Sequence, residues 1–333
     1  MKPMYKGNQG YALIIVLWSM VILSIIFVNL VDEIHLTSLL LRNNLDSQNA
    51  YQTLVSGFTL GVNELKADNN NHDNKEDQWV KAIEGELNNF KYRVKIEDIG
   101  SKLNINYLSV EDLQNLNWWD KEVEGYFKER LIPELILLKE IIGDDYSKVE
   151  EVFTTYGAFN LNNNSLERLK VLMDFLDIDQ FESQLILNFL DKKRKEKGIV
   201  SKINDLQVLY LQGLSMSTLD KLKNYISTQG SININFASSE TLELLFKILK
   251  VNRADRIKIL EANRRGNIKK ISQLKISNQA IKSYFTTESR YFLIEVQCYN
   301  LSGKKVKELR STVKRVRNDK NQWEIKILRW SEK

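Results

Sequence analysis

The feature that most constrains this chain is an uncharged run of twenty-one residues from Tyr11 to Val31, YALIIVLWSMVILSIIFVNLV. As an α-helix it would span roughly 31 Å, the thickness of the hydrocarbon core of a bilayer. Lys2 and Lys6 precede the run, and Asp32 and Glu33 follow it. The positive-inside rule then places the N-terminus in the cytoplasm and the bulk of the chain outside it. A single-pass anchor in the cytoplasmic (inner) membrane is predicted, because the short apolar core and cleavage site of a secretory signal peptide are missing.

The helical pattern continues beyond this run. Apolar residues recur mostly three to four apart as far as Leu65, and no proline interrupts them before the polar stretch ADNNNHDNKED. The spacing predicts one helix over 11–65, with a transmembrane half at 11–31 and an amphipathic outer half. The outer half needs a surface on which to pack.

Strand patterning occurs in KYRVKIED and, near the end of the chain, in SRYFLIEVQCYN, KVKELRSTVKRV and NQWEIKILRW. These alternating runs predict a small antiparallel sheet that covers the outer half of the helix. A short helix is expected for QWVKAIEGELNNF. The sequence thus predicts an α+β fold in which 66–98 and 288–333 form the α/β part and an all-α domain, 99–287, is inserted.

The inserted region shows helical periodicity, most clearly in EVEGYFKERLIPELILLKEIIG and LERLKVLMDFL. Pro133 is expected to kink or restart the first of these helices. The region also contains a repeat, because Leu103-Asn104-Ile105-Asn106-Tyr107 aligns with Ile232-Asn233-Ile234-Asn235-Phe236. In both copies a serine then stands where it can cap a helix, with glutamate in the first turn.

These repeated units resemble helix-hairpin-helix modules. In the nucleic-acid-binding form of such modules, a glycine-rich hairpin points backbone amides at a phosphate. The hairpins expected here, at 249–253, 211–215 and 117–120, contain at most one glycine. The pattern therefore favours a scaffold for protein contacts over nucleic-acid binding.

The residues that commonly mark an enzyme are missing from the sequence. Cys298 is the single cysteine, His35 and His72 are the two histidines, and no Walker loop, GxSxG or HExxH motif occurs. We therefore expect no catalytic activity.

The net charge is +5, and from Gly303 to Lys333 eleven Lys or Arg stand against four Asp or Glu. That run is either a contact face or, as we prefer, a solvated strand surface.

Taken in order, six segments resemble the family of minor pseudopilin K of type II secretion over nearly the whole chain. They are GNQGYALIIVLWSM, DIGSKLNINYLS, VLMDFLDID, LQVLYLQGLSMSTLDKLKNYISTQGSININFASSETLELL, SRYFLIEV and ILRWSE. The resemblance implies a pilin-like fold with an inserted helix-hairpin-helix or SAM-like domain. It also implies that residues 1–10 are a leader, and that prepilin peptidase cuts after Gly10 and methylates Tyr11.

The resemblance further implies a role in assembly. Such a protein forms or initiates the tip of the pseudopilus with other minor pseudopilins, supports protein export, and contacts secreted substrate or the outer channel. Most pilins carry glutamate at the fifth mature position, which here is Ile15. An apolar residue suits a subunit at the tip, because a carboxylate that lacks a neighbouring subunit's amine as its partner costs several kcal/mol in a bilayer. No cofactor is required.

Calcium is the one metal that the resemblance suggests. Asp174, Asp177 and Asp179 offer oxygen-rich spacing for a hard cation, although carboxylates that cap or flank a helix are the simpler interpretation. Two other functions stay open: a minor pilin of a type IV pilus or competence system with DNA-binding units, and a membrane-tethered enzyme with a polar cleft. An uncut anchor is the alternative to a processed leader.

Overall fold

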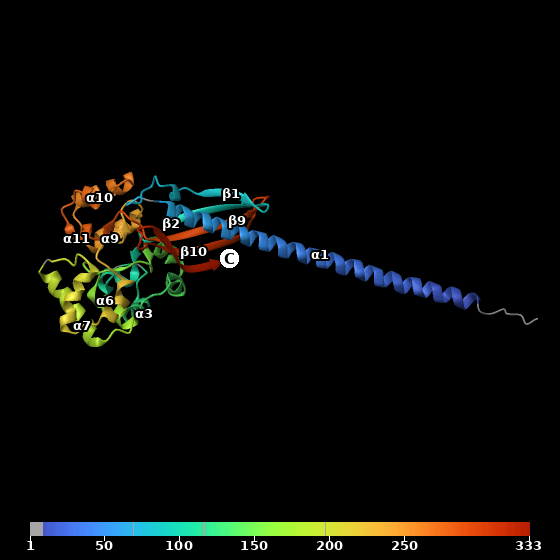
Figure 1. Ribbon diagram of the computed structural model, residues 1–333, viewed down its shortest axis with the longest axis horizontal. Helices are drawn as coiled ribbons and strands as arrows, with labels where there is room; N and C mark the ends of the chain where they lie inside the picture. The colour runs from blue at the N-terminus through green and yellow to red at the C-terminus, as the bar shows by residue number, and fades with distance from the viewer. Residues whose placement is uncertain (1–8, 69, 115, 117, 197) are drawn as a thin grey trace, which may run out of the picture.

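The computed structural model describes residues 9–68, 70–114, 116, 118–196 and 198–333. One long helix, α1 (Gln9–Ala67), projects from a head that contains the rest of the chain (Figure 1). The helix runs without a break from the membrane-length run into the head, as its uninterrupted periodicity predicts. It is the one helix in the described residues that is long and apolar enough, by length and composition, to cross a membrane.

A five-stranded antiparallel sheet holds the last third of α1. Its strand order is β1-β2-β9-β10-β11. The strands are β1 (Ile83–Leu87), β2 (Phe90–Asp98), β9 (Tyr291–Asn300), β10 (Lys305–Arg317) and β11 (Trp323–Glu332). The expected combination of a long helix and an antiparallel sheet in an α+β chain is thereby confirmed.

The helix expected for residues 78–90 is wrong. Only Gln78–Val80 forms a turn of 3-10 helix, and β1 follows it. Asn88 and Asn89 both have positive φ, 52° and 64°, which is the conformation of a two-residue hairpin turn. Gly85 lies opposite Tyr92, whose ring leaves no room for a β-carbon there. These two local features favour a hairpin over a helix.

The helix α1 packs closely against one face of the sheet. Leu54, Phe58 and Leu65 are buried in a core that they share with residues of β2, β9 and β10. Gly57 and Gly61 allow this approach: a β-carbon at Gly57 would lie 2.7 Å from Val296 Cγ1. The outer half of the helix thus has the surface that its pattern requires.

The residues between β2 and β9 are mainly helical. The helices are α2 (Val110–Leu113), α3 (Lys121–Glu129), α4 (Lys139–Ile142), α5 (Tyr146–Val152), α6 (Leu166–Phe175), α7 (Gln180–Lys195), α8 (Met216–Lys223), α9 (Ser239–Ile248), α10 (Arg253–Arg265) and α11 (Gln279–Lys282). The helical pattern restarts around Pro133, as expected: α3 ends at Glu129, and 3-10 helix begins at Leu135. Proline disfavours helical backbone in the residue before it, which fits the break.

Three pairs of two-residue parallel strands divide this region into three units. They are β3 (Leu103–Asn104) with β4 (Phe153–Thr154), β5 (Phe159–Asn160) with β6 (Ile226–Ser227), and β7 (Ile232–Asn233) with β8 (Phe285–Thr286). We call residues 103–154 unit 1, 159–227 unit 2 and 232–286 unit 3. The first and last strands of each unit pair with each other, so each unit is closed on itself.

The middle unit was not predicted. Its start, FNLNNNSLERL, aligns with LNINYLSVEDL and ININFASSETL. Asn163 and Asn164 stand where the other two units have apolar residues, which obscures the repeat in the sequence. The shared pattern is nevertheless two asparagines separated by one apolar residue, and then a serine.

The second asparagine of each unit makes the same pair of hydrogen bonds. Its side-chain NH2 group donates to the backbone carbonyl of one later residue in the same unit. Its side-chain oxygen accepts from the backbone N–H of that same residue. The pairs are Asn106 with Ile132, Asn162 with Val200, and Asn235 with Ile268. Each asparagine therefore clamps a loop of its own unit.

Units 1 and 2 are joined by a buried arginine. Arg168, at the start of α6, donates to the carbonyls of Asn106, Phe127 and Arg130 in unit 1. Its guanidinium also lies 3.9 Å from the centre of the Phe127 ring. Burial lowers the pKa of Arg168 to about 10, which leaves it charged at neutral pH. The three hydrogen bonds compensate for burying that charge.

Candidate functional site

The predicted processing site lies in the first turn of α1. The helix begins at Gln9, so both Gly10 and Tyr11 have helical backbone. Residues 1–8 of the predicted leader lie outside the described residues. The Ile15 side chain, one turn further on, is exposed along the apolar part of α1. Cleavage after Gly10, methylation of Tyr11 and the tip role of Ile15 stay predictions.

The three predicted calcium ligands lie around the turn between α6 and α7. Asp174 is exposed near the end of α6, and Asp177 has a positive φ of 51°. The Asp179 carboxylate accepts hydrogen bonds from the N–H groups of Phe181 and Glu182, and so caps α7. The Lys221 ammonium donates to the Asp177 carbonyl at 3.1 Å. Calcium binding here remains a prediction, and the observed role of Asp179 is that of a helix cap.

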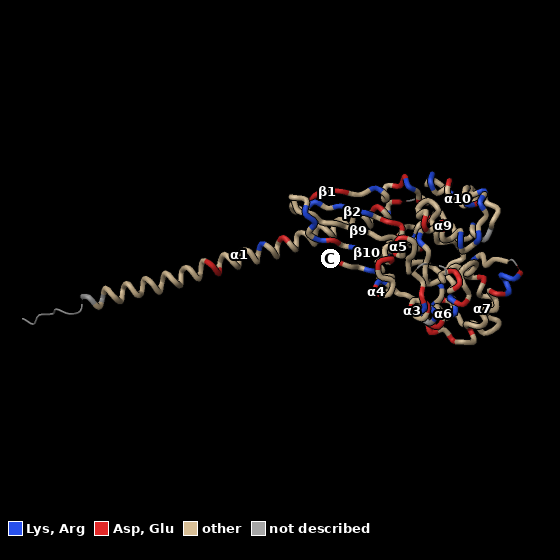
Figure 2. Tube along the Cα trace, turned by 180° about the vertical axis from the view of Figure 1, so that it is seen from behind, with Lys and Arg blue, Asp and Glu red and all other residues tan. Residues whose placement is uncertain are grey.

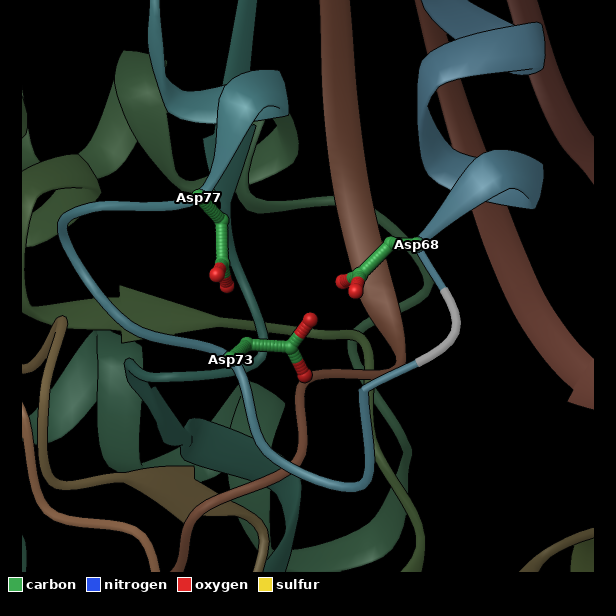
Figure 3. Close-up of side chains that lie close together, drawn as sticks. All are labelled: Asp68, Asp73 and Asp77. Carbon is green, nitrogen blue, oxygen red and sulfur yellow. The ribbon is translucent and has the colours of Figure 1, made fainter.

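A different set of carboxylates comes together in the structure. Asp68, Asp73 and Asp77 each present an oxygen, and these oxygens lie within 4.8 Å of one another (Figure 3). Asp68 directly follows α1, and the other two lie on the connection from α1 to β1. Among the residues that the structure describes, it is the one group of three or more His, Cys, Asp or Glu residues whose ligand atoms lie this close together.

Arg315 of β10 supplies the positive charge at this cluster. Its guanidinium lies 3.1 Å from Asp68 Oδ2 and 2.5 Å from Asp73 Oδ1, and its side chain is fully buried. It also donates to the Ser289 carbonyl and lies over the rings of Phe292 and Trp323. We call Arg315 and the three aspartates the Arg315 cluster.

The cluster is linked to unit 3. Asn233 and Asn235 both donate their side-chain amides to the Asp73 carbonyl, at 3.2 and 2.8 Å. The Asp73 carboxylate accepts from the Ser289 N–H at 2.6 Å. Thus Asp73 binds the sheet through its side chain and unit 3 through its backbone.

A fourth carboxylate lies on the same network. Asp98, at the end of β2, accepts 2.5 Å hydrogen bonds from the hydroxyls of Ser101 and Ser289. The Ser289 hydroxyl in turn accepts from the Asn233 amide. The end of α1, the sheet and unit 3 therefore meet at one buried polar network.

Burial determines how these acids titrate. It raises the pKa of Asp73 from 3.8 to about 7, although Arg315 opposes the shift. It also raises the pKa of Asp98 and of Asp77. One guanidinium serves two carboxylates, so the cluster has more buried acid than counter-charge. The network therefore favours a bound proton near neutral pH.

The chemistry of this cluster fits a structural junction. A hard cation is normally held by several oxygens with no competing positive group, whereas here Arg315 already occupies the space between Asp68 and Asp73. The other oxygen of Asp73 accepts a hydrogen bond from the Ser289 N–H, and Asp77 Oδ2 accepts one from the Asn74 N–H. The arrangement can fix the end of α1 against the sheet and unit 3.

The sequence contains a signal for this cluster. All three of its acids lie in the polar stretch after α1. Arg315 lies at an inward position of the alternating run KVKELRSTVKRV, where an apolar residue is usual. An inward cation in a strand requires a buried partner, and nearby acidic residues are the obvious source.

An apolar stripe on α1 is the second surface available for function. Leu30, Ile34, Leu41 and Leu45 are exposed and follow one another at intervals of four, seven and four residues. Leu54, which faces the sheet, comes nine residues after Leu45, or about two and a half turns. The stripe therefore lies on the side of the helix opposite the sheet and continues from the membrane-length run.

No protein-family model matches the chain, and no curated protein matches it. Among solved structures, it is similar to a chain of the GspK-GspI-GspJ complex from the type 2 secretion system of enterotoxigenic Escherichia coli. The two chains are 14% identical, the match covers 88% of this chain and 98% of the other, and the TM-score is 0.42.

Proposed function

We propose that this protein is a membrane-anchored minor pseudopilin of a type II secretion system. It forms or initiates the tip of the pseudopilus with other minor pseudopilins and so supports protein export. The observation that carries the proposal is α1: one continuous helix joins a membrane-length apolar run to a sheet-bound half, with a free stripe on its other side. A plain anchor has no need for a continuous helix of 59 residues.

The stripe gives the proposal its mechanism. Exposed leucine and isoleucine side chains at intervals of four and seven residues are what a second helix packs against. The partners are the corresponding helices of other minor pseudopilins. The head then lies beyond the membrane, and its three helical units make it bulky, which favours the tip over a repeated position along a close-packed filament.

Assembly, not catalysis, is the proposed activity. In the described residues, the buried acids of the Arg315 cluster are engaged by arginine, serine and amide groups, and they stabilise the junction between α1 and the head. No cofactor is part of the proposal. The protein is placed in the inner membrane with its head outside the cytoplasm.

The assembly step is tested by co-purification from detergent-solubilised membranes with candidate minor pseudopilins of the same cell. Two double variants make a matched pair: Leu41→Asn with Leu45→Asn on the stripe, and Leu36→Asn with Leu40→Asn on another side of the same segment. Leu40 and Leu41 are 57% and 58% exposed, so the change in hydrophobicity is similar. We expect the stripe variant to lose the partner and the other to keep it. Failure of the unaltered protein to capture any minor pseudopilin would contradict the proposal.

Processing is tested separately by mass spectrometry of the membrane-extracted protein. We expect a chain that begins at methylated Tyr11, cut by prepilin peptidase. Gly10→Val should abolish the cut, while Gly7→Val, three residues away, should leave it intact. An unaltered protein that retains Met1 or Lys2 would show that the run is an uncut anchor.

A further inference from the structure

The three units of the head share one architecture but differ greatly in charge. Unit 1 contains five Lys or Arg and twelve Asp or Glu, which gives −7. Unit 2 contains ten against nine, which gives +1, and unit 3 contains eleven against four, which gives +7. The whole chain has a net charge of only +5. Because the same fold forms with either sign, the positive charge of unit 3 is not required for folding.

The cations of unit 3 are at its surface. Nine of the eleven are exposed, and they lie on or beside the α9–α10 hairpin and the segment that follows it (Figure 2). They are Lys247, Lys250, Arg253, Lys258, Arg264, Arg265, Lys269, Lys270 and Lys275. Arg253 and Arg264 are eleven residues apart on α10, which is about three turns, so they share one face. We call these nine residues the basic face of unit 3.

The acidic residues of unit 3 do little to neutralise this face. Asp255 is buried, and although burial opposes it, hydrogen bonds from Ser277 and Asn278 lower its pKa to about 2. Glu243 pairs with Arg256, which is outside the face, and Glu261 approaches Arg265 at 3.7 Å. In the described residues, Arg253, Arg264 and Lys269 have no carboxylate within ion-pair distance.

The basic C-terminal strands differ in this respect. There, Arg315 is buried in its cluster, Arg310 pairs with Glu295 and Glu308, and Arg329 pairs with Glu134. With Lys305, which pairs with Glu308, four of the eleven cations in residues 303–333 have a carboxylate partner in the described structure. In unit 3 two of the eleven do, Arg256 and Arg265, so unit 3 has the larger share of unpaired cations.

The apolar content of the surface distinguishes among partners. Protein–protein interfaces have an apolar, aromatic-rich core, whereas nucleic-acid interfaces are polar and strongly positive. Among the described side chains of unit 3, Ile257 is the one large apolar residue that is exposed. Unit 2, by contrast, exposes seven: Phe175, Phe181, Ile199, Val208, Leu211, Met216 and Tyr225. The basic face thus has the composition of a surface for a polyanion.

The position of unit 3 excludes the lipid of the anchoring membrane as that polyanion. The helix α10 lies at the end of the head far from the free end of α1 (Figure 1). Beyond the membrane-length run, which ends at Val31, α1 continues for 36 residues to Ala67, or about 54 Å at 1.5 Å per residue. Nine cations over one hairpin and its flank fit a polymer with closely spaced charges, and duplex DNA has one phosphate charge per about 1.7 Å of axis.

We propose that the basic face of unit 3 binds the phosphate backbone of double-stranded DNA without regard to base sequence. The cations displace condensed counterions from the duplex, so the affinity depends strongly on salt. A glycine-rich hairpin is not needed for this contact, because the lysine and arginine side chains make it. The proposal is independent of assembly with other pseudopilins, since it uses a different surface.

The test is fluorescence anisotropy of a labelled duplex of mixed sequence with the full-length protein in a non-ionic detergent, over a range of salt concentrations. The variant Arg253→Ala with Arg264→Ala and Lys269→Ala removes three charges from the basic face. The control, Lys192→Ala with Lys193→Ala and Lys195→Ala, removes three charges from α7 of unit 2. Both proteins have the same net charge. Lys269 lies in a loop, so the single variant Lys269→Glu replaces the triple variant in this test if the triple variant does not fold.

We expect micromolar binding at low salt that the unit 3 variant weakens at least tenfold and the control less than threefold. The slope of log K against log salt should become shallower by about 2.7 for three lost phosphate contacts. Absence of binding at about 100 μM protein in low salt would overturn the proposal. An equal loss in both variants would do the same, because it would reflect net charge alone. Salt-sensitive self-association without DNA binding, measured by sedimentation velocity, would assign the face to unit 1 of a second copy instead.

Discussion

The guanidinium of Arg315 and the carboxylate of Asp73 form a fully buried ion pair at 2.5 Å, although 242 residues separate them in the sequence. The pair joins the connection after α1 to the central region of the sheet. Through the Asp73 carbonyl it also reaches the two asparagines of unit 3. One contact therefore fixes the orientation of three parts of the molecule.

Replacement of Arg315 should destabilise the head strongly. Arg315→Met leaves Asp73 and Asp68 without their counter-charge, and removing one partner of a buried pair typically costs about 3–5 kcal/mol. The free energy of unfolding, measured by urea titration of the detergent-solubilised chain with tryptophan fluorescence, should fall by that amount. Lys326→Met, on the exposed part of the neighbouring strand, is the control and should change it by less than about 0.5 kcal/mol. Similar values for the two variants would contradict the structural role of the cluster.

The stability of the head should decrease as pH rises from 4 to 7. The unfolded chain releases the Asp73 proton near 3.8, whereas the folded protein holds it until about 7. Over this window the folded state binds more protons, so each pH unit removes up to about 1.4 kcal/mol of stability per group. Asp98 and Asp77 act in the same direction, because burial also raises the pKa of each.

Asp73→Asn should make this pH dependence shallower. The measurement is the urea midpoint of both proteins at intervals from pH 4 to pH 8. Asp255→Asn is the control: the pKa of Asp255 is lowered from 3.8 to about 2, so its contribution to stability is lost only as pH falls below about 4, and the slope between pH 4 and pH 8 should stay close to that of the unaltered protein. A wild-type midpoint that rises between pH 4 and pH 7 would refute the expected direction.

The approach of α1 to the sheet should depend on Gly57. Gly57→Leu places a side chain where even a β-carbon would lie 2.7 Å from Val296. Overpacking of this kind typically costs about 1–3 kcal/mol, and the thermal midpoint should fall accordingly. Val296→Ala makes room at the same point, so combining it with Gly57→Leu should recover part of the loss. Unchanged stability of Gly57→Leu would mean that the helix is not held at this distance.

The asparagine clamps should stabilise each unit separately. Asn235→Ala removes an amide that bonds both backbone groups of Ile268, and leaving buried polar groups unpaired costs about 1–3 kcal/mol. Asn267→Ala, at an exposed neighbouring position, should have little effect. Hydrogen exchange of the Ile268 amide should accelerate in Asn235→Ala and stay unchanged in Asn267→Ala. Equal exchange in both would show that the clamp contributes nothing.

Much of the fold could be predicted because its signals are local. The run from Tyr11 and the periodicity to Leu65 predict α1, and the alternating runs predict β2, β9, β10 and β11. The error at 78–90 arose because the hairpin depends on positive φ at Asn88 and Asn89 and on the fit of Gly85 to Tyr92. Neither is visible in a hydrophobic pattern.

The site was harder to predict because its members are distant in sequence. Asp68, Asp73 and Asp77 belong to a stretch that looks like a polar linker, and their partner Arg315 lies near the other end of the chain. By contrast, the predicted acidic group of Asp174, Asp177 and Asp179 is close in sequence, yet Asp179 caps a helix. Unit 2 escaped notice because asparagines replace the apolar residues of its repeat.

The closure of each unit by its own pair of strands bears on how such a head can grow. A unit begins and ends at adjacent points, and Asp98 and Phe292, at the two ends of the whole helical region, are likewise paired across β2 and β9. Duplication or loss of a unit therefore leaves the register of the sheet unchanged. A gene encoding this architecture can change the size of the head, and the charge of one unit, while the helix and sheet that hold it keep their geometry.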